Sequence, residues 1–302
     1  MALTPNTLVE AALKGGERHL YRIDLSPGRF ADLVVEQRGI DVVLRLSGPA
    51  GRQFPEVDSP NGELGPEPLP LLGAPGPLHL EICPADPRAA SGHYAVRVGA
   101  VRAATDRDRA HVAAERGFAT AERLRRLGDG AALKAAAKGT EEAAARFLDL
   151  GEHGRAGDAL YSLGRALGSL GESEAALVAF EKALPEARAA GDRRAQGRLL
   201  SSLVGLHNAL GHPDRAQGCA REALALYRSL GDQRGEATAL NNLGRSQADL
   251  GLAEEALASY DRSLALWQRL GMRDHEGLTL VNRANVFGGL GELQRALDDL
   301  DR

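Results

Sequence analysis

The sequence predicts an antiparallel β-sandwich in its first hundred residues and an α-helical solenoid over the remaining two-thirds. In the later part, Leu-Gly recurs every 40 residues, and a second glycine series recurs in phase with it. A fixed period of this length is typical of a stacked helical array. In the first part, short runs that alternate in polarity lie between dense turn signals, which is typical of antiparallel strands.

Composition and charge limit the classes of function. The chain has 302 residues, enough for about two domains. Its net charge is -4, whereas a nucleic-acid partner would call for a concentrated basic face. No segment approaches the ~18 apolar residues of a membrane span, and the N-terminus lacks the features of a signal peptide. Cys83 and Cys219 fall in different predicted domains, which argues against a disulfide framework. We therefore expect a cytoplasmic protein without nucleic-acid or membrane partners.

Turn signals divide residues 1–101 into about eight short segments. They lie at 14–16, 26–28, 48–51, 59–62 and 73–76. Runs such as 20–25, 42–46 and 94–98 alternate in polarity, as expected of strands with one buried face. Short strands at this spacing predict an antiparallel sandwich.

Three short motifs in this region carry a resemblance to a known module. They are Tyr-Arg-Ile-Asp-Leu-Ser-Pro-Gly at 21–28, Gly-Ile-Asp-Val-Val-Leu at 39–44 and Gly-His-Tyr-Ala-Val-Arg-Val at 92–98. The region resembles the bacterial pre-peptidase C-terminal domain, a jelly-roll-like accessory module often attached to peptidases. That resemblance implies a jelly-roll-like sandwich over residues 1–101.

Residues 102–110 are expected to form a linker and the start of the first helix. Thr105 is a favourable N-cap residue, and Asp106 and Asp108 supply the acids favoured in a first turn.

Two glycine series define the helical units. One is the Leu-Gly series at 170–171, 210–211, 250–251 and 290–291, and the other is Gly151, Gly191, Gly231 and Gly271. Each series marks the end of a helix, because glycine readily adopts the left-handed conformation that terminates helices. The expected array covers 111–302, in units of about 111–151, 152–191, 192–231 and 232–271 with an incomplete unit 272–302.

One unit shows the repeat pattern most fully, with Leu160, Leu163-Gly164, Ala176, Phe180 and Ala183. This order of a large residue, Leu-Gly, Ala, an aromatic residue and Ala resembles the tetratricopeptide repeat. The next unit departs from it, with Val204 in place of the glycine and Ala220 in place of the aromatic residue. Tetratricopeptide units usually have about 34 residues, so a 40-residue period implies longer second helices, as in the kinesin-light-chain type.

The order of a sandwich followed by 40-residue repeats also resembles the front end of bacterial CHAT-domain proteins. Those proteins carry a caspase-like peptidase domain after the repeats. The resemblance implies that these residues form the recognition or regulatory part of a longer protein, and the peptidase part is not within them. The chain itself is then expected to be an interaction scaffold and not an enzyme.

The resemblance to tetratricopeptide repeats also implies where a ligand binds. In that family the first helix of each unit lines a concave groove, and peptide contacts fall mostly at its second, fifth, sixth and ninth positions. The candidate groove residues here are Tyr161, Arg165, Arg198, Ser202, Asn241, Asn242, Arg245, Asn282 and Asn285. Asparagine amides can pair with both groups of a peptide backbone, and arginines can hold a carboxylate. The expected partner is a protein or peptide that is acidic or carboxylate-ended, although surface helices carry such residues for solubility too.

Catalytic and metal-binding patterns are sparse, and no cofactor or metal is expected. His79 and Cys83 share one face of a predicted strand, but four residues place them ~13 Å apart, too far for proton exchange. Asp41, Glu56 and Asp58 could contribute to a calcium site, or they could stabilise turns. Two alternatives therefore stay open: a carbohydrate- or calcium-binding sandwich with the repeats as a spacer, and a hydrolase in its own right.

The last unit carries an unpaired apolar stripe that includes Leu290, Leu297 and Leu300. A stacked array needs a polar terminal cap. We therefore expect these leucines to be exposed, the chain to be a fragment, and this end to support weak self-association.

Overall fold

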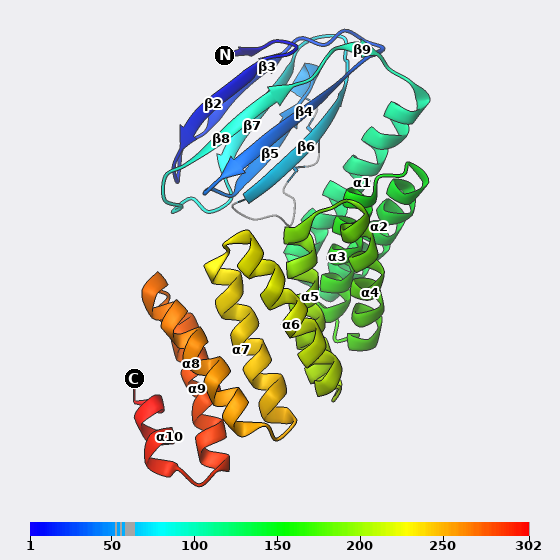
Figure 1. Cartoon of the computed structure of the whole chain (residues 1–302). Coiled ribbons are helices and arrows are strands. Elements are labelled where there is room, and N and C mark those ends of the chain that lie inside the picture. The colour runs from blue at the N-terminus through cyan, green and yellow to red at the C-terminus, as the bar shows by residue number, and fades with distance from the viewer. Residues whose placement is uncertain (52, 55, 58–63, 302) are drawn as a thin grey trace. The chain divides into compact units, whose positions relative to one another are not determined.

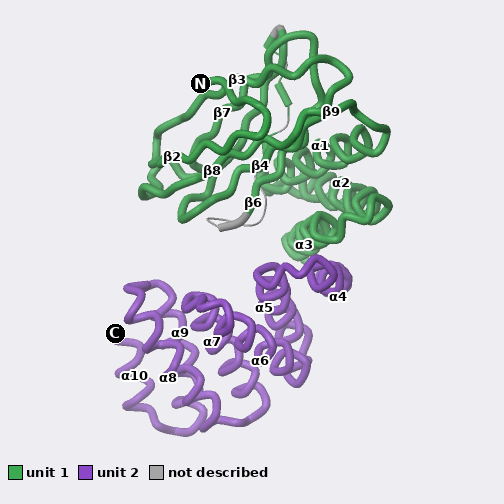
Figure 2. Tube along the Cα trace, turned by 45° about the horizontal axis from the view of Figure 1, so that its top comes forward, with its two compact units in different colours: residues 1–171 green, residues 172–302 purple. Residues whose placement is uncertain are grey.

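A computed structural model describes the chain except for residues 52, 55, 58–63 and 302. The predicted turn at 59–62 and Asp58 lie outside the described residues. The chain forms two compact units, Met1–Gly171 and Glu172–Arg302 (Figure 2). The first contains all the described strands and three helices, and the second contains seven helices, so the predicted order of a sandwich and a helical array is confirmed.

Nine described strands form two sheets in the first unit (Figure 1). They are β1 (Ala2–Leu3), β2 (Leu8–Leu13), β3 (His19–Ile23), β4 (Arg29–Arg38), β5 (Val42–Ser47), β6 (Leu64–Leu72), β7 (Leu78–Pro84), β8 (Gly92–Val98) and β9 (Arg102–Ala103). One sheet has the order β1-β3-β7-β5 and the other β2-β8-β4-β6, with β9 also paired to β4. All pairs are antiparallel except β1 with β3, a two-residue parallel pair.

The predicted alternation in the strands matches their burial. Tyr21, Ile23 and Leu25 are buried, whereas Leu20 is exposed on the opposite face. The Tyr94 hydroxyl lies 2.7 Å from the Tyr21 hydroxyl and 2.6 Å from His19 Nδ1, so hydrogen bonds join the two sheets across the core. Burial, followed by its contact with Tyr21, raises the pKa of Tyr94, so this group stays protonated.

Ten helices follow the strands in the described chain. They are α1 (Asp106–Leu127), α2 (Gly130–Asp149), α3 (His153–Ser169), α4 (Ser173–Ala189), α5 (Arg193–Ala209), α6 (Pro213–Leu230), α7 (Gln233–Asp249), α8 (Ala253–Leu270), α9 (Arg273–Gly289) and α10 (Leu293–Leu300). None of these described helices combines the length and apolarity that a membrane crossing requires. In both predicted glycine series the residues have φ between 67° and 80°, which confirms the left-handed helix ends.

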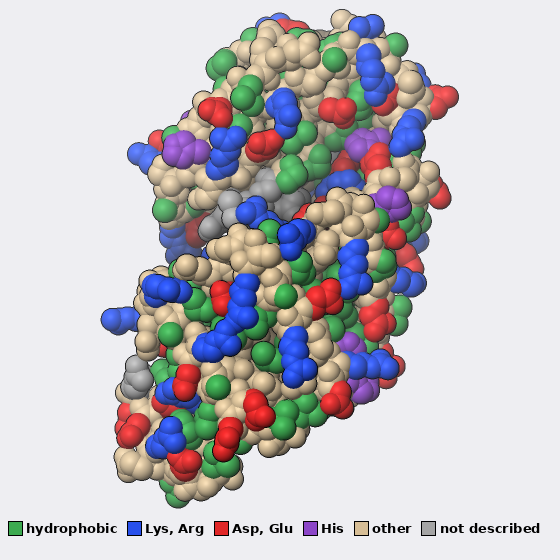
Figure 3. Space-filling model, viewed as in Figure 1, with side chains coloured by type: hydrophobic (Ala, Val, Ile, Leu, Met, Phe, Trp, Pro, Cys, Tyr) green, Lys and Arg blue, Asp and Glu red, His purple; other side chains and the backbone are tan. Residues whose placement is uncertain are grey.

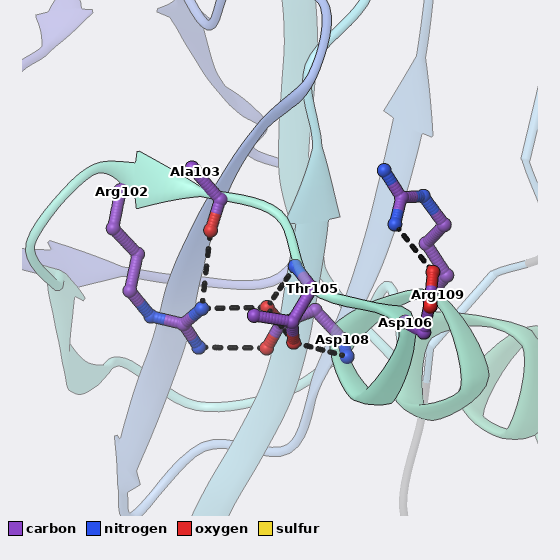
Figure 4. Close-up of polar contacts among 6 residues, drawn as sticks. All are labelled: Arg102, Ala103, Thr105, Asp106, Asp108 and Arg109. Carbon is purple, nitrogen blue, oxygen red and sulfur yellow. Dashed lines mark hydrogen bonds and ion pairs between the residues drawn. The ribbon is translucent and has the colours of Figure 1, made fainter.

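The start of α1 is held by the predicted cap (Figure 4). Asp108 N–H donates to Thr105 Oγ1 at 3.2 Å, and Thr105 N–H donates to Asp108 Oδ2 at 2.8 Å, a reciprocal capping box. Arg102 in β9 donates to both oxygens of the same carboxylate, at 2.5 and 2.6 Å. These bonds to Arg102, together with those to Thr105, hold the pKa of Asp108 well below its usual value. The cap therefore joins the helix to the edge of the sheet.

A buried ionic cluster joins the first three helices. Arg155 in α3 donates to Glu115 of α1 at 2.6 and 2.5 Å and to Asp158 at 3.0 Å. Its guanidinium also lies 5.0 Å from the Phe118 ring centroid and 5.5 Å from that of Phe147. Burial opposes the charge of Arg155, but the two carboxylates outweigh it and raise its pKa.

Packing in residues 172–302 explains why one repeat departs from the tetratricopeptide pattern. A Cβ atom added to Gly244 of α7 would lie 2.7 Å from the Tyr260 ring, so this ring requires a glycine opposite it. One period earlier, Val204 and Ala220 occupy the equivalent positions, and both are buried in one core cluster. In this repeat the larger residue, Val204, is on the first helix and the smaller one, Ala220, is on the second, the reverse of Gly244 and Tyr260. The space between the two helices therefore stays filled.

His207 is a buried histidine at a position that Leu167, Gln247 and Phe287 occupy in the other units. It is 4% exposed, and its Nδ1 has no hydrogen-bond partner among the described residues. Burial lowers the pKa of His207; Arg215 and His212 act in the same direction, and Glu181 opposes them. The folded state therefore binds this proton less readily than the unfolded state, in which the pKa is about 6.5.

This imbalance predicts a loss of stability in mild acid. As pH falls through about 6.5 and below, the unfolded state gains a proton at residue 207 before the folded state does, so the free energy of unfolding should fall. His207→Phe, which copies the buried Phe287, should remove this part of the pH dependence. Urea unfolding at pH 7.5 and pH 5.0 measures it, with His93→Phe on an exposed strand position as the control. An unchanged pH dependence in His207→Phe would contradict the assignment.

The C-terminal leucines are exposed, as the sequence predicts. Leu290, Leu297 and Leu300 are 50%, 54% and 57% exposed. Self-association through them stays a prediction.

Candidate functional site

A groove lies along α7, α8 and α9 in the second unit. It encloses about 650 Å³. It is lined by Arg245, Ala248, Asp249, Gly251, Ala253, Tyr260, Asn282, Asn285, Val286, Gly289 and Leu290. Three of the residues expected from the sequence, Arg245, Asn282 and Asn285, therefore lie on one groove.

Hydrogen bonds connect the polar side chains beside this groove. Asn282 Nδ2 donates to Asn241 Oδ1 at 3.1 Å, which fixes the orientation of both amides between α9 and α7. Ser246 Oγ lies 3.2 Å from Asn208 Oδ1 and 3.1 Å from the backbone oxygen of Asn242, so the contacts continue toward α5. Asn241, Asn242 and Asn282 are half-buried, while Arg245 and Asn285 are exposed to solvent. The amides of Asn241 and Asn282 are thus fixed by each other, and the Arg245 guanidinium is open to solvent.

The other expected residues do not line this groove. Arg198 and Ser202 lie on α5, where Ser202 Oγ donates to the Arg198 backbone oxygen at 3.1 Å. Both are half-buried. Tyr161 and Arg165 lie on α3 in the first unit.

Asp249 and Tyr260 are polar groove residues that the sequence did not predict. Asp249 is an exposed acid four residues after Arg245, and Tyr260 is a buried ring from α8. Residues four apart share a helix face, so the position of Asp249 relative to Arg245 could have revealed it. Burial is the main cause that raises the pKa of Tyr260; Asp249 adds to it and Arg245 opposes it, so both charges act at the Tyr260 hydroxyl. The groove therefore carries one positive and one negative side chain one helical turn apart.

Charges of both signs are interspersed over the face of the helices shown in Figure 3, and no single-sign patch covers that face. This face is suited to local recognition by particular side chains more than to general attraction of a polyanion.

Asp41, Glu56 and Asp58 were the residues considered for a calcium site. Glu56 accepts from Arg45 Nε at 2.6 Å, and Asp58 lies outside the described residues. No group of three His, Cys, Asp or Glu side chains placed to hold a metal is found where the structure is described. Of the sandwich aromatics, Tyr21, Phe30 and Tyr94 are buried and Phe54 is half-buried.

The two cysteines are half-buried thiols. Cys83 Sγ lies 3.8 Å from the Val43 backbone oxygen, on the same face of β7 as His79. Burial raises the pKa of Cys83 and of Cys219, which disfavours the thiolate that a nucleophile needs.

The helical part of the chain matches family models over two segments. Both models are described as tetratricopeptide repeat, one over residues 157–184 and the other over residues 235–302. The chain carries tetratricopeptide repeats. No curated protein matches the chain.

Several solved structures share a fold with part of this chain. BtubC (BKLC) from P. vanneervenii is 21% identical, with 66% of this chain and 90% of that chain covered and a TM-score of 0.52. A kinesin-light-chain-type protein of Podosopora anserina with nearly identical TPR-like repeats is 16% identical, with coverage of 60% and 90% and a TM-score of 0.51. Aspartyl phosphate phosphatase F from Bacillus subtilis is 10% identical, with coverage of 64% and 50% and a TM-score of 0.53. These likenesses concern the fold alone.

Proposed function

We propose that the tetratricopeptide repeats bind an extended segment of another protein in the groove along α7, α8 and α9. The observation that carries the proposal is the convergence of Arg245, Asn282 and Asn285 on one cavity of about 650 Å³. This volume lies within the range of ligand-binding pockets. It suits a few residues of a peptide better than a folded domain.

The chemistry of the groove favours a segment with a carboxylate. The Arg245 guanidinium can pair with a side-chain or terminal carboxylate, and the Asn282 and Asn285 amides can bond to the peptide backbone. Asp249 lies one helical turn from Arg245, so it favours a donor group next to that carboxylate. The proposed ligand is therefore an extended peptide with a carboxylate followed at short spacing by a hydrogen-bond donor.

The test uses peptides selected from a random library displayed with a free C-terminus. Charge-assisted hydrogen bonds contribute about 1.5–3 kcal/mol each, so Arg245→Ala combined with Asn282→Ala should weaken binding of a selected peptide at least ~10-fold. Fluorescence polarisation measures the affinity, and added salt should also reduce it. Arg269→Ala, an exposed arginine of α8 away from the groove lining, is the matched control and should change affinity less than ~2-fold. Selected peptides that bind the double variant and the parent chain equally would contradict the groove assignment.

Two finer assignments belong to this proposal. The chain acts by binding and not by hydrolysis, and the burial that raises the pKa of the Cys83 and Cys219 thiols supports this. The sequence resemblance further supports a role as the recognition part of a CHAT-type protein. A caspase-like reading frame directly after codon 302 is the expected finding, and an unrelated frame or a stop codon there would count against that role.

A further inference from the structure

The open side of the sandwich lies where its two sheets end. β5, whose outer edge forms isolated bridges to Gln53 and Val57, is the last strand of one sheet, and β6 is the last strand of the other. Edge strands invite pairing with other chains unless they are covered or blocked. In β6, proline occupies every second position from Pro66 to Pro70, and the strand keeps a continuous register with β4. Because proline has no N–H, the outer edge of β6 lacks donors at these positions and is poorly suited to another strand.

Helix α1 covers this open side. β6 and α1 are in contact, and Ala119 belongs to the same core cluster as the sandwich residues. The surfaces that meet are Leu46, Phe54, Val57, Pro68, Leu69 and Pro70 of the sandwich with Val112, Glu115, Arg116 and Ala119 of α1. The space left between them is about 20 Å³, room for little more than one water. Val112 is 1% exposed, so the helix face is as well covered as a domain core.

Polar contacts fix the position of α1 against the sandwich. At the start of the helix, Arg102 of β9 holds Asp108 through two hydrogen bonds. In the middle, the Arg116 guanidinium lies 4.5 Å from the centroid of the Phe54 ring. Beside Arg116, Glu115 binds the buried Arg155 of α3, and the carboxylate of Glu67, a fully buried residue of β6, also favours the charge of that arginine.

We infer that the sandwich is the amino-terminal cap of the tetratricopeptide array, and that α1 in return closes the open side of the sandwich. Stacked repeats leave an apolar face at each end and need a terminal element with a polar outer surface. Here a β-sandwich covers that face on α1. This function needs no ligand, so it is independent of peptide binding in the α7–α9 groove.

The experiment compares two substitutions of the same kind on the same helix. Ala119→Arg places a charge in the contact, whereas Ala113→Arg places it at an exposed position of α1. Hydrogen exchange of the full chain is measured by mass spectrometry. In Ala119→Arg, amide protection should fall at least ~100-fold both in α1 and in β6, because a buried unpaired charge is incompatible with the packed contact. Ala113→Arg should change protection less than ~3-fold, and α7 in the second unit serves as the internal reference.

A milder variant keeps the test decisive if Ala119→Arg does not fold. Phe54→Ala removes the ring under Arg116 and should lower protection at least ~10-fold in α1 and β6 together. Protection lost in only one of these two elements, or a response no larger than that of Ala113→Arg, would overturn the inference. Either result would mean that the sandwich is tethered to the array without capping it.

Discussion

Replacing Arg155 with Ala is expected to lower the free energy of unfolding by about 3–5 kcal/mol. The substitution removes the positive charge that Arg155 supplies to the carboxylates of Glu115 and Asp158, whose side chains are only 6% and 12% exposed. It also removes the cation that lies over the rings of Phe118 and Phe147. Urea unfolding followed by circular dichroism measures the change.

A second variant at position 155 separates charge from geometry, and a variant at an exposed ion pair serves as the control. Arg155→Lys keeps the charge but loses the two-pronged pairing with Glu115, so it should be destabilised by an intermediate amount. Arg188→Ala removes an ion pair with Glu222 whose partners are 50% and 46% exposed, and it should cost less than about 1 kcal/mol. A loss below about 1 kcal/mol for Arg155→Ala would show that the cluster contributes little to stability.

In one repeat the large and small residues that face each other across the two helices have exchanged positions. Ala220→Phe should destabilise the protein by about 1–3 kcal/mol, because Val204 already fills the space that the ring would need. Val204→Gly alone should also destabilise it, by removing a buried side chain and placing glycine within a helix. The double variant restores the arrangement of Gly244 with Tyr260, so it should be more stable than the sum of the two single effects by at least about 1 kcal/mol.

A double-mutant cycle of chemical denaturation tests this coupling. The matched control combines Ala220→Phe with Val178→Gly, a substitution at an exposed position of α4. Substitutions at distant sites are expected to change the free energy of unfolding additively, so the control pair should show no coupling. Additive effects in the Val204 and Ala220 pair would mean that the two departures from the repeat pattern are unrelated.

Local signals predicted the parts of the fold that depend on neighbouring residues. The left-handed turn at Gly251 and the cap at Thr105 follow from the conformational preferences of single residues, and both were confirmed. The 40-residue period likewise predicted the helix pairs, because the same spacing of apolar residues recurs on each helix.

Contacts between residues that are distant in the sequence could not be predicted in the same way. Glu115 and Arg155 are 40 residues apart, and their pairing depends on which faces of α1 and α3 meet. The same holds for the sandwich contact at Ala119, because an alanine carries no sequence signal for the surface it faces. In the groove, register placed Arg245, Asn282 and Asn285 on one surface, but Tyr260 enters from a different helix.

The helix-ending positions require glycine because of their left-handed backbone conformation and not because they lack space for a side chain. A Cβ atom at Gly171, Gly211, Gly251 or Gly291 would meet no atom within 4 Å, although each residue has φ between 74° and 80°. An L-residue is disfavoured there by its own backbone, at a cost of about 1–2 kcal/mol. A D-alanine has the opposite backbone preference, so this positive φ would carry no such cost for it. The repeat boundaries therefore favour glycine because of the handedness of their backbone and not because they lack space for a side chain.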